Sequence, residues 1–389
     1  IKANEYFLKA CDLNNRLGCS NLAFSYDSGR GIQQDHKQAN DFFRKACDLE
    51  DELSCTGLGF NYEKGLGVLR DYSKANDFYS KACDLGEKLG CSYLGANYDK
   101  GRGIQRDYKK ANELFGKACN LGEGGGCINL GYNYAYGRGV RQDFNRSNEL
   151  FSKACDLGEG LGCSNLGFSY KKGRGFQKSY FKANELFSRA CDLGEGLGCS
   201  NLGSSYRDGL GVKQDYKEAV KLYRLSANNG YASAQNKLGD MYRYGNGVKR
   251  DYEEAVKWYR KAAEQGYAAA QYNLGGMYRY GYGVKQDHSE AVSWYRRAAE
   301  QGYSISQNSL GFMYYNGYGV KKDYREAAKW FRLAADQGND QAKTNLGKMY
   351  RRGEGVAQNY DEAVRLWQEA ARAGYSGARE ALKERGISW

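Results

Sequence analysis

The sequence predicts an all-α protein, an α/α solenoid of about eleven helix-turn-helix repeats of 36 residues. A glycine pair, GxG, recurs every 36 residues, and between successive pairs apolar side chains fall at helical spacing in two runs. The first glycines of the pairs are Gly29, Gly65, Gly101, Gly137, Gly173, Gly209, Gly245, Gly281, Gly317 and Gly353. One helical hairpin of this length is too small to bury its own apolar face, so neighbouring repeats must stack on one another.

The first helix of the period is well defined in residues 245–280. Asp251 is a natural N-cap, and Asp251 with Glu254 forms a capping box that predicts the start of a helix. Tyr259 and several alanines follow at helical spacing. Gly266 predicts the end of this helix, because glycine readily adopts the left-handed conformation that closes many helices.

A second helix is predicted after a short turn, with Leu274 and Met277 on its apolar side and Gly275 in its interior. A glycine in the middle of a helix costs roughly 1 kcal/mol relative to alanine. The same glycine recurs at Gly59, Gly95, Gly131, Gly167, Gly203, Gly239, Gly311 and Gly347. Its recurrence predicts that another helix approaches closely at this position.

These residues, DYxxAxxWYxxAA followed by LGxxYxxGxGV, resemble the Sel1-like repeat, a relative of the tetratricopeptide repeat. The resemblance covers essentially all 389 residues. It implies a right-handed superhelix of the tetratricopeptide kind and a non-enzymatic scaffold for protein or peptide partners. Because the family's motif positions are packing positions, the resemblance specifies the fold much more closely than the partner.

Charge and hydropathy limit the classes of function. The net charge is +12, with 30 basic and 27 acidic side chains in residues 1–216 and 28 basic and 19 acidic in residues 217–389. We interpret this mild excess as a solvated repeat surface and, since no nucleic-acid-binding motif is present, we expect no nucleic-acid partner. No apolar run approaches the ~18 residues of a membrane span, and no signal peptide is visible. Ile1 falls inside the first turn of a repeat helix, so we expect that the chain is cut from a longer protein.

The repeats fall into two arrays joined near residue 217. Residues 1–216 contain every cysteine, whereas residues 217–389 contain none and carry the capping boxes. Because the period crosses the junction without a slip, we expect one continuous solenoid. The last helix, around Gly377–Arg385, lacks the glycine and tyrosine of the repeat. Loss of packing residues on one side is typical of a terminal capping helix.

The twelve cysteines form six pairs with the spacing CxxxxxxxC. Each pair straddles the tight turn between two antiparallel helices, where α-carbons come within the ~5.5 Å that a disulfide requires. Buried free thiols are the alternative; they suit the first cysteine, which later repeats replace by alanine, but not the second, which becomes glutamine, lysine or arginine. Such replacements indicate positions near solvent, so we favour disulfides and an exported protein, periplasmic or secreted. The pairs are Cys11 and Cys19, Cys47 and Cys55, Cys83 and Cys91, Cys119 and Cys127, Cys155 and Cys163, and Cys191 and Cys199.

The phrase ACDLGEGLGCSNLG, at residues 154–167 and 190–203, resembles the Helicobacter cysteine-rich protein family. This resemblance covers the first six repeats and implies one disulfide per hairpin. It also implies a rival function, weak penicillin binding or β-lactamase-like hydrolysis.

Catalytic motifs give that rival little support. The motif SxxK of β-lactamases occurs at Ser169–Lys172 and Ser179–Lys182, about as often as chance predicts, and the accompanying SDN and KTG motifs are absent. The only histidines, His36 and His288, occupy a column otherwise filled by tyrosine or phenylalanine. We interpret them as aromatic substitutes, because a metal site needs several clustered ligands. We therefore predict no catalytic residue, no metal and no cofactor.

An asparagine column runs through the first array, where later repeats have valine or alanine. A polar side chain at an otherwise apolar position must find hydrogen-bond partners. We therefore predict a hydrogen-bonded ladder between stacked helices, with ligand contact as the alternative. The column comprises Asn4, Asn40, Asn76, Asn112, Asn148 and Asn184.

By resemblance to tetratricopeptide proteins, the helix containing LG lines a concave groove that holds extended peptides. Groove positions are then Asn129, Asn165, Asn201, Asn273, Tyr132, Phe168 and Phe312. Near the helix ends come Arg207, Arg243, Arg279 and Arg351, with Tyr244 and Tyr280 directly after two of them. These arginines and tyrosines suit an acidic or C-terminal peptide, and the alternative is that the arginines only stabilise helix C-termini.

Overall fold

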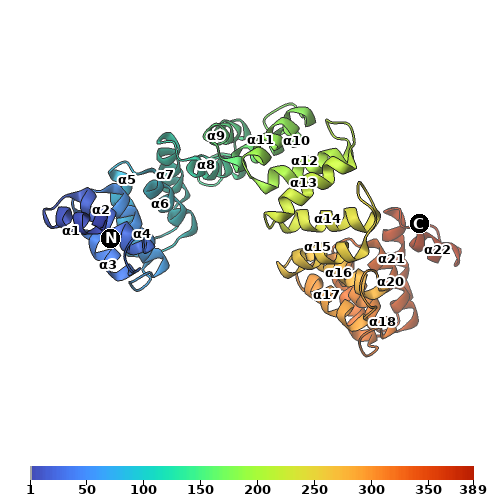
Figure 1. The fold of residues 1–389 in the computed structure, drawn as a ribbon. Coiled ribbons are helices and arrows are strands. Elements are labelled where there is room, and N and C mark those ends of the chain that lie inside the picture. Colours follow the sequence, from blue (N-terminus) through green and yellow to red (C-terminus); the bar gives the residue numbers. More distant parts are fainter. Residues whose placement is uncertain (1) are drawn as a thin grey trace. The chain divides into compact units, whose positions relative to one another are not determined.

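The computed structural model describes residues 2–389, and the expectation for Ile1 lies outside the described residues. Over that range the chain forms twenty-two α-helices and no β-strand (Figure 1). The odd-numbered helices are α1 (Lys2–Asp12), α3 (His36–Asp48), α5 (Tyr72–Asp84), α7 (Tyr108–Asn120), α9 (Phe144–Asp156), α11 (Tyr180–Asp192), α13 (Tyr216–Asn228), α15 (Tyr252–Glu264), α17 (His288–Glu300), α19 (Tyr324–Asp336) and α21 (Tyr360–Arg372). The even-numbered helices, which contain the LG motif, are α2 (Arg16–Ser28), α4 (Glu52–Lys64), α6 (Lys88–Lys100), α8 (Gly124–Tyr136), α10 (Gly160–Lys172), α12 (Gly196–Asp208), α14 (Ala232–Tyr244), α16 (Ala268–Tyr280), α18 (Ser304–Asn316), α20 (Asp340–Arg352) and α22 (Ser376–Lys383). The predicted all-α repeat fold, an α/α solenoid, is confirmed.

The helices belong to two compact units. Unit 1 comprises the residues up to Asn201 together with Leu210–Val212, and unit 2 comprises Leu202–Gly209 and Lys213–Trp389. Within each unit, an even-numbered helix packs on the odd-numbered helices before and after it. Neighbouring even-numbered helices also contact one another directly. For example, α4 contacts both α2 and α6. In the described range no helix is both long and apolar enough to cross a membrane.

Each odd-numbered helix from α3 to α21 starts at a capping aspartate or its equivalent, as predicted. Asp251 Oδ1 accepts a hydrogen bond from the Glu254 N–H at 3.0 Å. The predicted capping box also requires the Glu254 side chain to accept a hydrogen bond from the Asp251 N–H, and this part of the prediction was wrong. The Asp251 N–H donates to the Tyr242 carbonyl instead, at 2.9 Å. Glu254 forms an ion pair with Lys257 instead, at 2.6 Å. The N-cap therefore joins the helix to the end of the preceding repeat.

The glycine pairs shape the loops between repeats. The first glycine closes each even-numbered helix from α2 to α20 in the left-handed conformation, as at Gly101 with φ of +68°. The second lies against the start of the odd-numbered helix one repeat back: a Cβ on Gly103 would lie 2.5 Å from the Tyr72 carbonyl carbon. Only glycine combines this backbone conformation with this contact.

From α4 to α20, the glycine inside each even-numbered helix contacts an aromatic ring of the next odd-numbered helix. A Cβ on Gly239 would lie 2.6 Å from the Tyr259 ring, and one on Gly95 would lie 2.9 Å from Phe115. Tyr259 and Phe115 are almost completely buried, so a ring that moved aside would displace other core side chains. The predicted close approach of helices is confirmed.

All six predicted disulfides are present, and the described chain has no free cysteine. Their Cα–Cα distances run from 4.5 Å for Cys11–Cys19 to 4.7 Å for Cys47–Cys55. Each joins the end of an odd-numbered helix to the first turn of the next even-numbered helix. All of them lie in unit 1.

The expectation that the second cysteine position lies near solvent was wrong. Cys19 is fully buried, and Gln271, at the equivalent position of unit 2, is only 4% exposed. The glutamine is tolerated there because its amide is satisfied: Gln271 Nε2 donates to the Ala263 carbonyl at 3.1 Å, and Oε1 accepts from Gln301 at 2.8 Å. Ala263 occupies the first cysteine position. A side-chain hydrogen bond thus spans the turn that a disulfide spans in unit 1.

Helix α22 packs its apolar side against α21. Leu382 is fully buried beside Trp367, the largest fully buried side chain of the described chain. This helix has eight residues, whereas α21 has thirteen. It covers the end of the repeat core in the manner expected of a capping helix.

Reduction should loosen unit 1 and leave unit 2 unchanged. Each disulfide joins cysteines with a sequence separation of 8, and the chain-entropy model assigns such a loop about 2.5 kcal/mol. Hydrogen exchange with a phosphine reductant should therefore accelerate in residues 2–200 and stay constant in residues 217–383. Equal acceleration in both units, or none in unit 1, would contradict this account of how the hairpins are held.

Candidate functional site

Polar side chains join even-numbered helices of successive repeats at the predicted groove positions. In unit 1 the Tyr132 hydroxyl of α8 donates to Asn165 Oδ1 of α10 at 3.0 Å. In unit 2 Asn273 Nδ2 of α16 donates to Asn236 Oδ1 of α14 at 2.9 Å. The structure therefore brings the predicted residues Tyr132 and Asn165 together, whereas Asn273 pairs with Asn236, which the sequence analysis did not name.

Four predicted groove residues line a single cavity of about 290 Å³ in unit 1. They are Tyr132, Asn165, Phe168 and Asn201. Further wall residues are Tyr136, Phe144, Phe151, Ser164, Ser169, Leu197 and Arg174. Five of the thirteen lining residues are aromatic, polar side chains come from α9, α10 and α12, and Arg174 supplies one guanidinium. Asn129 is half-buried and is not part of this lining.

The predicted arginine column of unit 2 lies on aromatic rings. The Arg279 guanidinium is 4.5 Å from the Phe312 ring centroid and 5.0 Å from that of Tyr280. Arg243 lies 5.2 Å from the Tyr244 ring. Tyr244 and Tyr280 are 60% and 52% exposed, and Tyr280 also stacks with Tyr282 at a centroid distance of 5.8 Å. The predicted residues thus form two groups, Arg279 with Phe312 and Tyr280, and Arg243 with Tyr244.

The two end members of the column differ from its centre. Arg207 donates two hydrogen bonds to Asp208, at 2.7 and 2.9 Å, so its charge is already paired. Arg351 Nε is buried without a hydrogen-bond partner. The centre of the column, Arg243 and Arg279, therefore differs from both ends, since neither guanidinium forms an ion pair with a carboxylate within the described chain.

A buried carboxyl group, missed by the sequence analysis, lies beside Arg243. Asp240 Oδ1 accepts a hydrogen bond from the Tyr259 hydroxyl at 2.6 Å. Burial raises the pKa of Asp240, while the Tyr259 hydrogen bond and the charges of Arg243 and Lys237 oppose that shift. Burial and the Asp240 charge raise the pKa of Tyr259, so its hydroxyl stays protonated. The buried Asp240 carboxyl group is therefore surrounded by the positive charges of Arg243, Arg207 and Lys237.

A second cationic column, in unit 1, was also missed. It occupies the middle position of GxG, where Arg138 lies 5.4 Å from the Tyr136 ring and Arg174 lies 5.5 Å from Phe168 and 5.7 Å from Phe144. Arg102 likewise lies 5.8 Å from the Tyr72 ring. The sequence signal for this column is the arginine that recurs at the middle position of GxG in these repeats.

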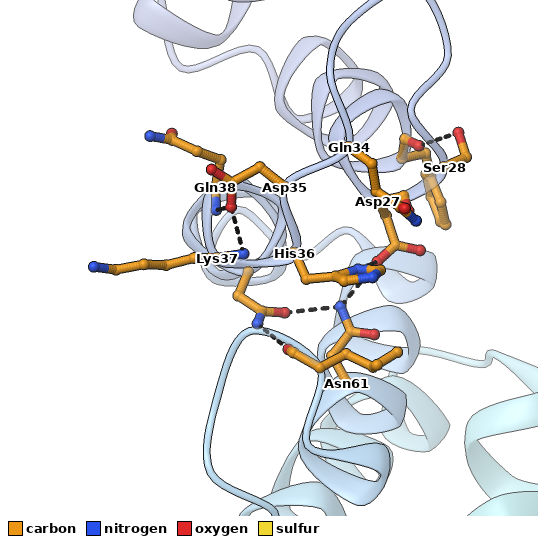
Figure 2. Close-up of polar contacts among 11 residues, drawn as sticks. Asp27, Ser28, Gln34, Asp35, His36, Lys37, Gln38 and Asn61 are labelled. Atoms are coloured by element: carbon orange, nitrogen blue, oxygen red, sulfur yellow. Dashed lines mark hydrogen bonds and ion pairs between the residues drawn. The ribbon is translucent and has the colours of Figure 1, made fainter.

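The asparagine column forms the predicted hydrogen-bonded ladder, with the loop of the next repeat as acceptor. Asn40 Nδ2 donates to the Leu66 carbonyl at 2.7 Å, and Asn61 Nδ2 donates to Asn40 Oδ1 at 2.8 Å. Asn61 also approaches Asp27, which contacts His36 Nδ1 at 3.0 Å (Figure 2). The same donation to a loop carbonyl is made by Asn4, Asn76, Asn112, Asn148 and Asn184. The structural interpretation of the column is confirmed.

Two members of the ladder lack their second bond. Asn148 Oδ1 and Asn184 Oδ1 are buried without a partner. In α4, α6 and α8 the donor is an asparagine, whereas in α10 the equivalent residue is Ser169, whose side chain is shorter. Ser169, one serine of the SxxK motifs, therefore stands at a structural position of the repeat.

The remaining candidates for chemistry have structural contacts. Ser179 caps α11, its hydroxyl accepting from the Lys182 N–H at 3.3 Å, while Lys182 Nζ lies 5.4 Å from the Tyr170 ring. His288 stacks on Tyr318 with centroids 5.3 Å apart, as an aromatic substitute would. Among the described residues no cluster of three or more histidine, cysteine or acidic side chains could hold a metal.

Comparison with known proteins identifies the repeat. The family model of the Sel1 repeat matches residues 1–15, 17–51, 53–87, 89–123, 125–159, 160–195, 196–231, 232–267, 268–303, 304–339 and 340–375. A solved protective antigen of uropathogenic Escherichia coli with an SLR fold is 29% identical, at a TM-score of 0.63 over 99% of this chain and 91% of that chain. A Sel1 repeat protein from Oxalobacter formigenes is 30% identical, at 0.60 over 79% and 90%. Helicobacter pylori cysteine rich protein B is 38% identical, at 0.28 over 32% and 90%. No curated protein matches the chain.

Changing one donor of the asparagine ladder should alter stability in a predictable direction. Asn97→Ser should leave the buried Asn76 Oδ1 without its donor, at a cost of about 1–3 kcal/mol. Ser169→Asn should instead raise stability, since the new amide supplies a donor near Asn148. Local hydrogen exchange in α5–α7 and α9–α11 measures both effects, and unchanged exchange in Asn97→Ser would show that the ladder contributes nothing.

Proposed function

Because the chain belongs to the Sel1 repeat family, we propose that it is a non-enzymatic scaffold that binds extended peptide or protein partners. The binding surface is a concave groove lined by the even-numbered helices. Stacked repeats of this kind offer an extended surface in which each repeat adds similar contacts. The two sequence arrays, 1–216 and 217–389, then contribute different side chains to one kind of surface.

The observation that best supports this function is the arginine and tyrosine column of unit 2. Arg243 and Arg279 lie on rings that hold their guanidinium groups in place. A guanidinium binds a carboxylate through two parallel hydrogen bonds, and an exposed tyrosine adds flat contact area at low entropic cost. These properties favour an acidic or C-terminal peptide segment as partner.

The disulfides favour export to the periplasm or the cell exterior. Six disulfides within one unit are typical of proteins that mature in oxidising compartments. Mass spectrometry of unreduced peptides from the natural source should find these six crosslinks. Free thiols at those positions would remove the case for export.

The rival function, weak hydrolysis of β-lactams, needs a serine activated by a nearby base. Lys172 and Lys182 instead place their ammonium groups over the rings of Phe168 and Tyr170. We therefore expect no saturable hydrolysis of a chromogenic cephalosporin. Turnover abolished by Ser169→Ala or Ser179→Ala would establish the rival instead.

Replacing Arg243 and Arg279 by alanine should weaken partner binding without unfolding the protein. Both residues are partly exposed, and surface substitutions usually change stability by less than ~0.5 kcal/mol. Affinity for a partner captured by the intact chain should fall about tenfold, and the remaining affinity should depend less on salt. Lys249→Ala with Lys285→Ala is the matched control, because it removes the same charge from exposed loop positions. Normal binding by the arginine variant, or its unfolding, would refute the groove assignment.

A further inference from the structure

The cavity of unit 1 has the size of a site for one side chain. Its volume of about 290 Å³ is at the lower limit for small-molecule pockets. We propose that it binds an aromatic side chain of an extended peptide whose neighbouring acidic side chains bind the arginines of the GxG loops. This inference rests on the proposed scaffold function and assigns its partner a chemistry.

The cavity wall favours an aromatic occupant. Tyr132 packs edge-on against Phe151 with centroids 5.4 Å apart, and its ring stacks with Tyr136 at 6.3 Å. Phe168 on the opposite repeat is 37% exposed, so part of its ring is uncovered. Aromatic rings gain from offset or edge-on contact with other rings beyond the area that they bury. An inserted aromatic side chain would extend this cluster.

Polar groups at the cavity lack partners that a peptide supplies. Asn165 Oδ1 accepts from Tyr132, but Asn165 Nδ2 is buried without an acceptor. Ser164, only 1% exposed, also has no hydrogen-bond partner. Unpartnered buried polar groups are rare, because each costs the free energy of a lost hydrogen bond. A small movement of the Asn165 amide on binding would give Nδ2 a peptide carbonyl as acceptor.

The charges around the cavity suit acidic side chains. Arg174 lines it from the loop after α10, and Lys172 lies 5.7 Å from the Phe168 ring. The charge of Glu195 also acts on Tyr132, but its carboxylate is engaged, since Oε1 accepts from the Leu197 N–H at 3.0 Å. The two cations, Arg174 and Lys172, therefore outnumber the one carboxylate, Glu195, beside the aromatic wall.

The arginines recur once per repeat, which distinguishes an acidic segment from a single C-terminus. Arg102, Arg138 and Arg174 occupy the same position of successive repeats. Packed helices lie about 8–10 Å apart, and an extended peptide advances about 3.3 Å per residue. Carboxylates spaced about three residues apart would therefore meet successive arginines. One terminal carboxylate would leave the other arginines unused.

The test uses the intact, oxidised chain and a synthetic probe. The probe is an amidated, fluorescein-labelled glycine peptide in which a tryptophan lies between two aspartates that are three residues apart, and fluorescence anisotropy measures its affinity. Phe168→Ala should weaken binding about tenfold, while Phe60→Ala, the same repeat position outside the cavity, should leave it unchanged. Arg174→Gln should weaken binding about fivefold at low salt, and Arg30→Gln, its counterpart in the first GxG loop, should not.

Three results would overturn the proposal. The first is no saturable binding of the probe at millimolar concentration. The second is equal binding of a probe whose tryptophan is alanine, or equal effects of Phe168→Ala and Phe60→Ala. The third is tighter binding of a peptide with one terminal carboxylate in place of both aspartates. If a captured partner is lost with the Arg243 and Arg279 variant but unaffected by Phe168→Ala, the scaffold function stands and the cavity assignment fails.

Ala135→Phe controls for stability, because it fills the cavity without removing a core side chain. This variant should retain its melting temperature and lose the probe. Retention of both would also overturn the assignment.

Discussion

The contact between a helix glycine and an aromatic ring is the constraint on which the rest of the fold depends. Gly239 leaves room for Tyr259, and the same pairing recurs from Gly59 to Gly347. It lets each even-numbered helix lie directly on the following odd-numbered helix, while the second glycine of each pair brings the loop against the preceding repeat. With the packing sides fixed in this way, the remaining face of the even-numbered helices carries the asparagines, arginines and tyrosines proposed to bind partners.

The two units close their hairpins by different chemistry at the same positions. Unit 1 uses disulfides, and unit 2 uses a buried glutamine whose amide reaches the carbonyl across the turn. A disulfide stabilises mainly by restricting the unfolded chain, whereas the glutamine contributes one net hydrogen bond of about 1 kcal/mol. The difference makes the stability of unit 1, but not that of unit 2, depend on the redox compartment.

The sequence predicted features that repeat and missed those that depend on one pair of neighbours. The period, the aspartate caps and the disulfides follow from local spacings that recur in successive repeats. The burial of Gln271 was missed because its partner Gln301 belongs to another repeat, and a charged replacement such as Lys343 suggested solvent. The cavity was predicted only in part: Tyr132 and Phe168 were identified as groove residues, but the cavity depends on side chains from four helices and a loop.

The central claim is that partners bind the face of the even-numbered helices, and hydrogen exchange of the complex with a captured partner tests it most directly. The account predicts slower exchange, on binding, in the even-numbered helices and the GxG loops, with the ends of α14 and α16 among the protected segments. Exchange in the odd-numbered helices should change little. Protection confined to the odd-numbered helices would contradict the claim, because it would place the partner on the opposite face of the repeats.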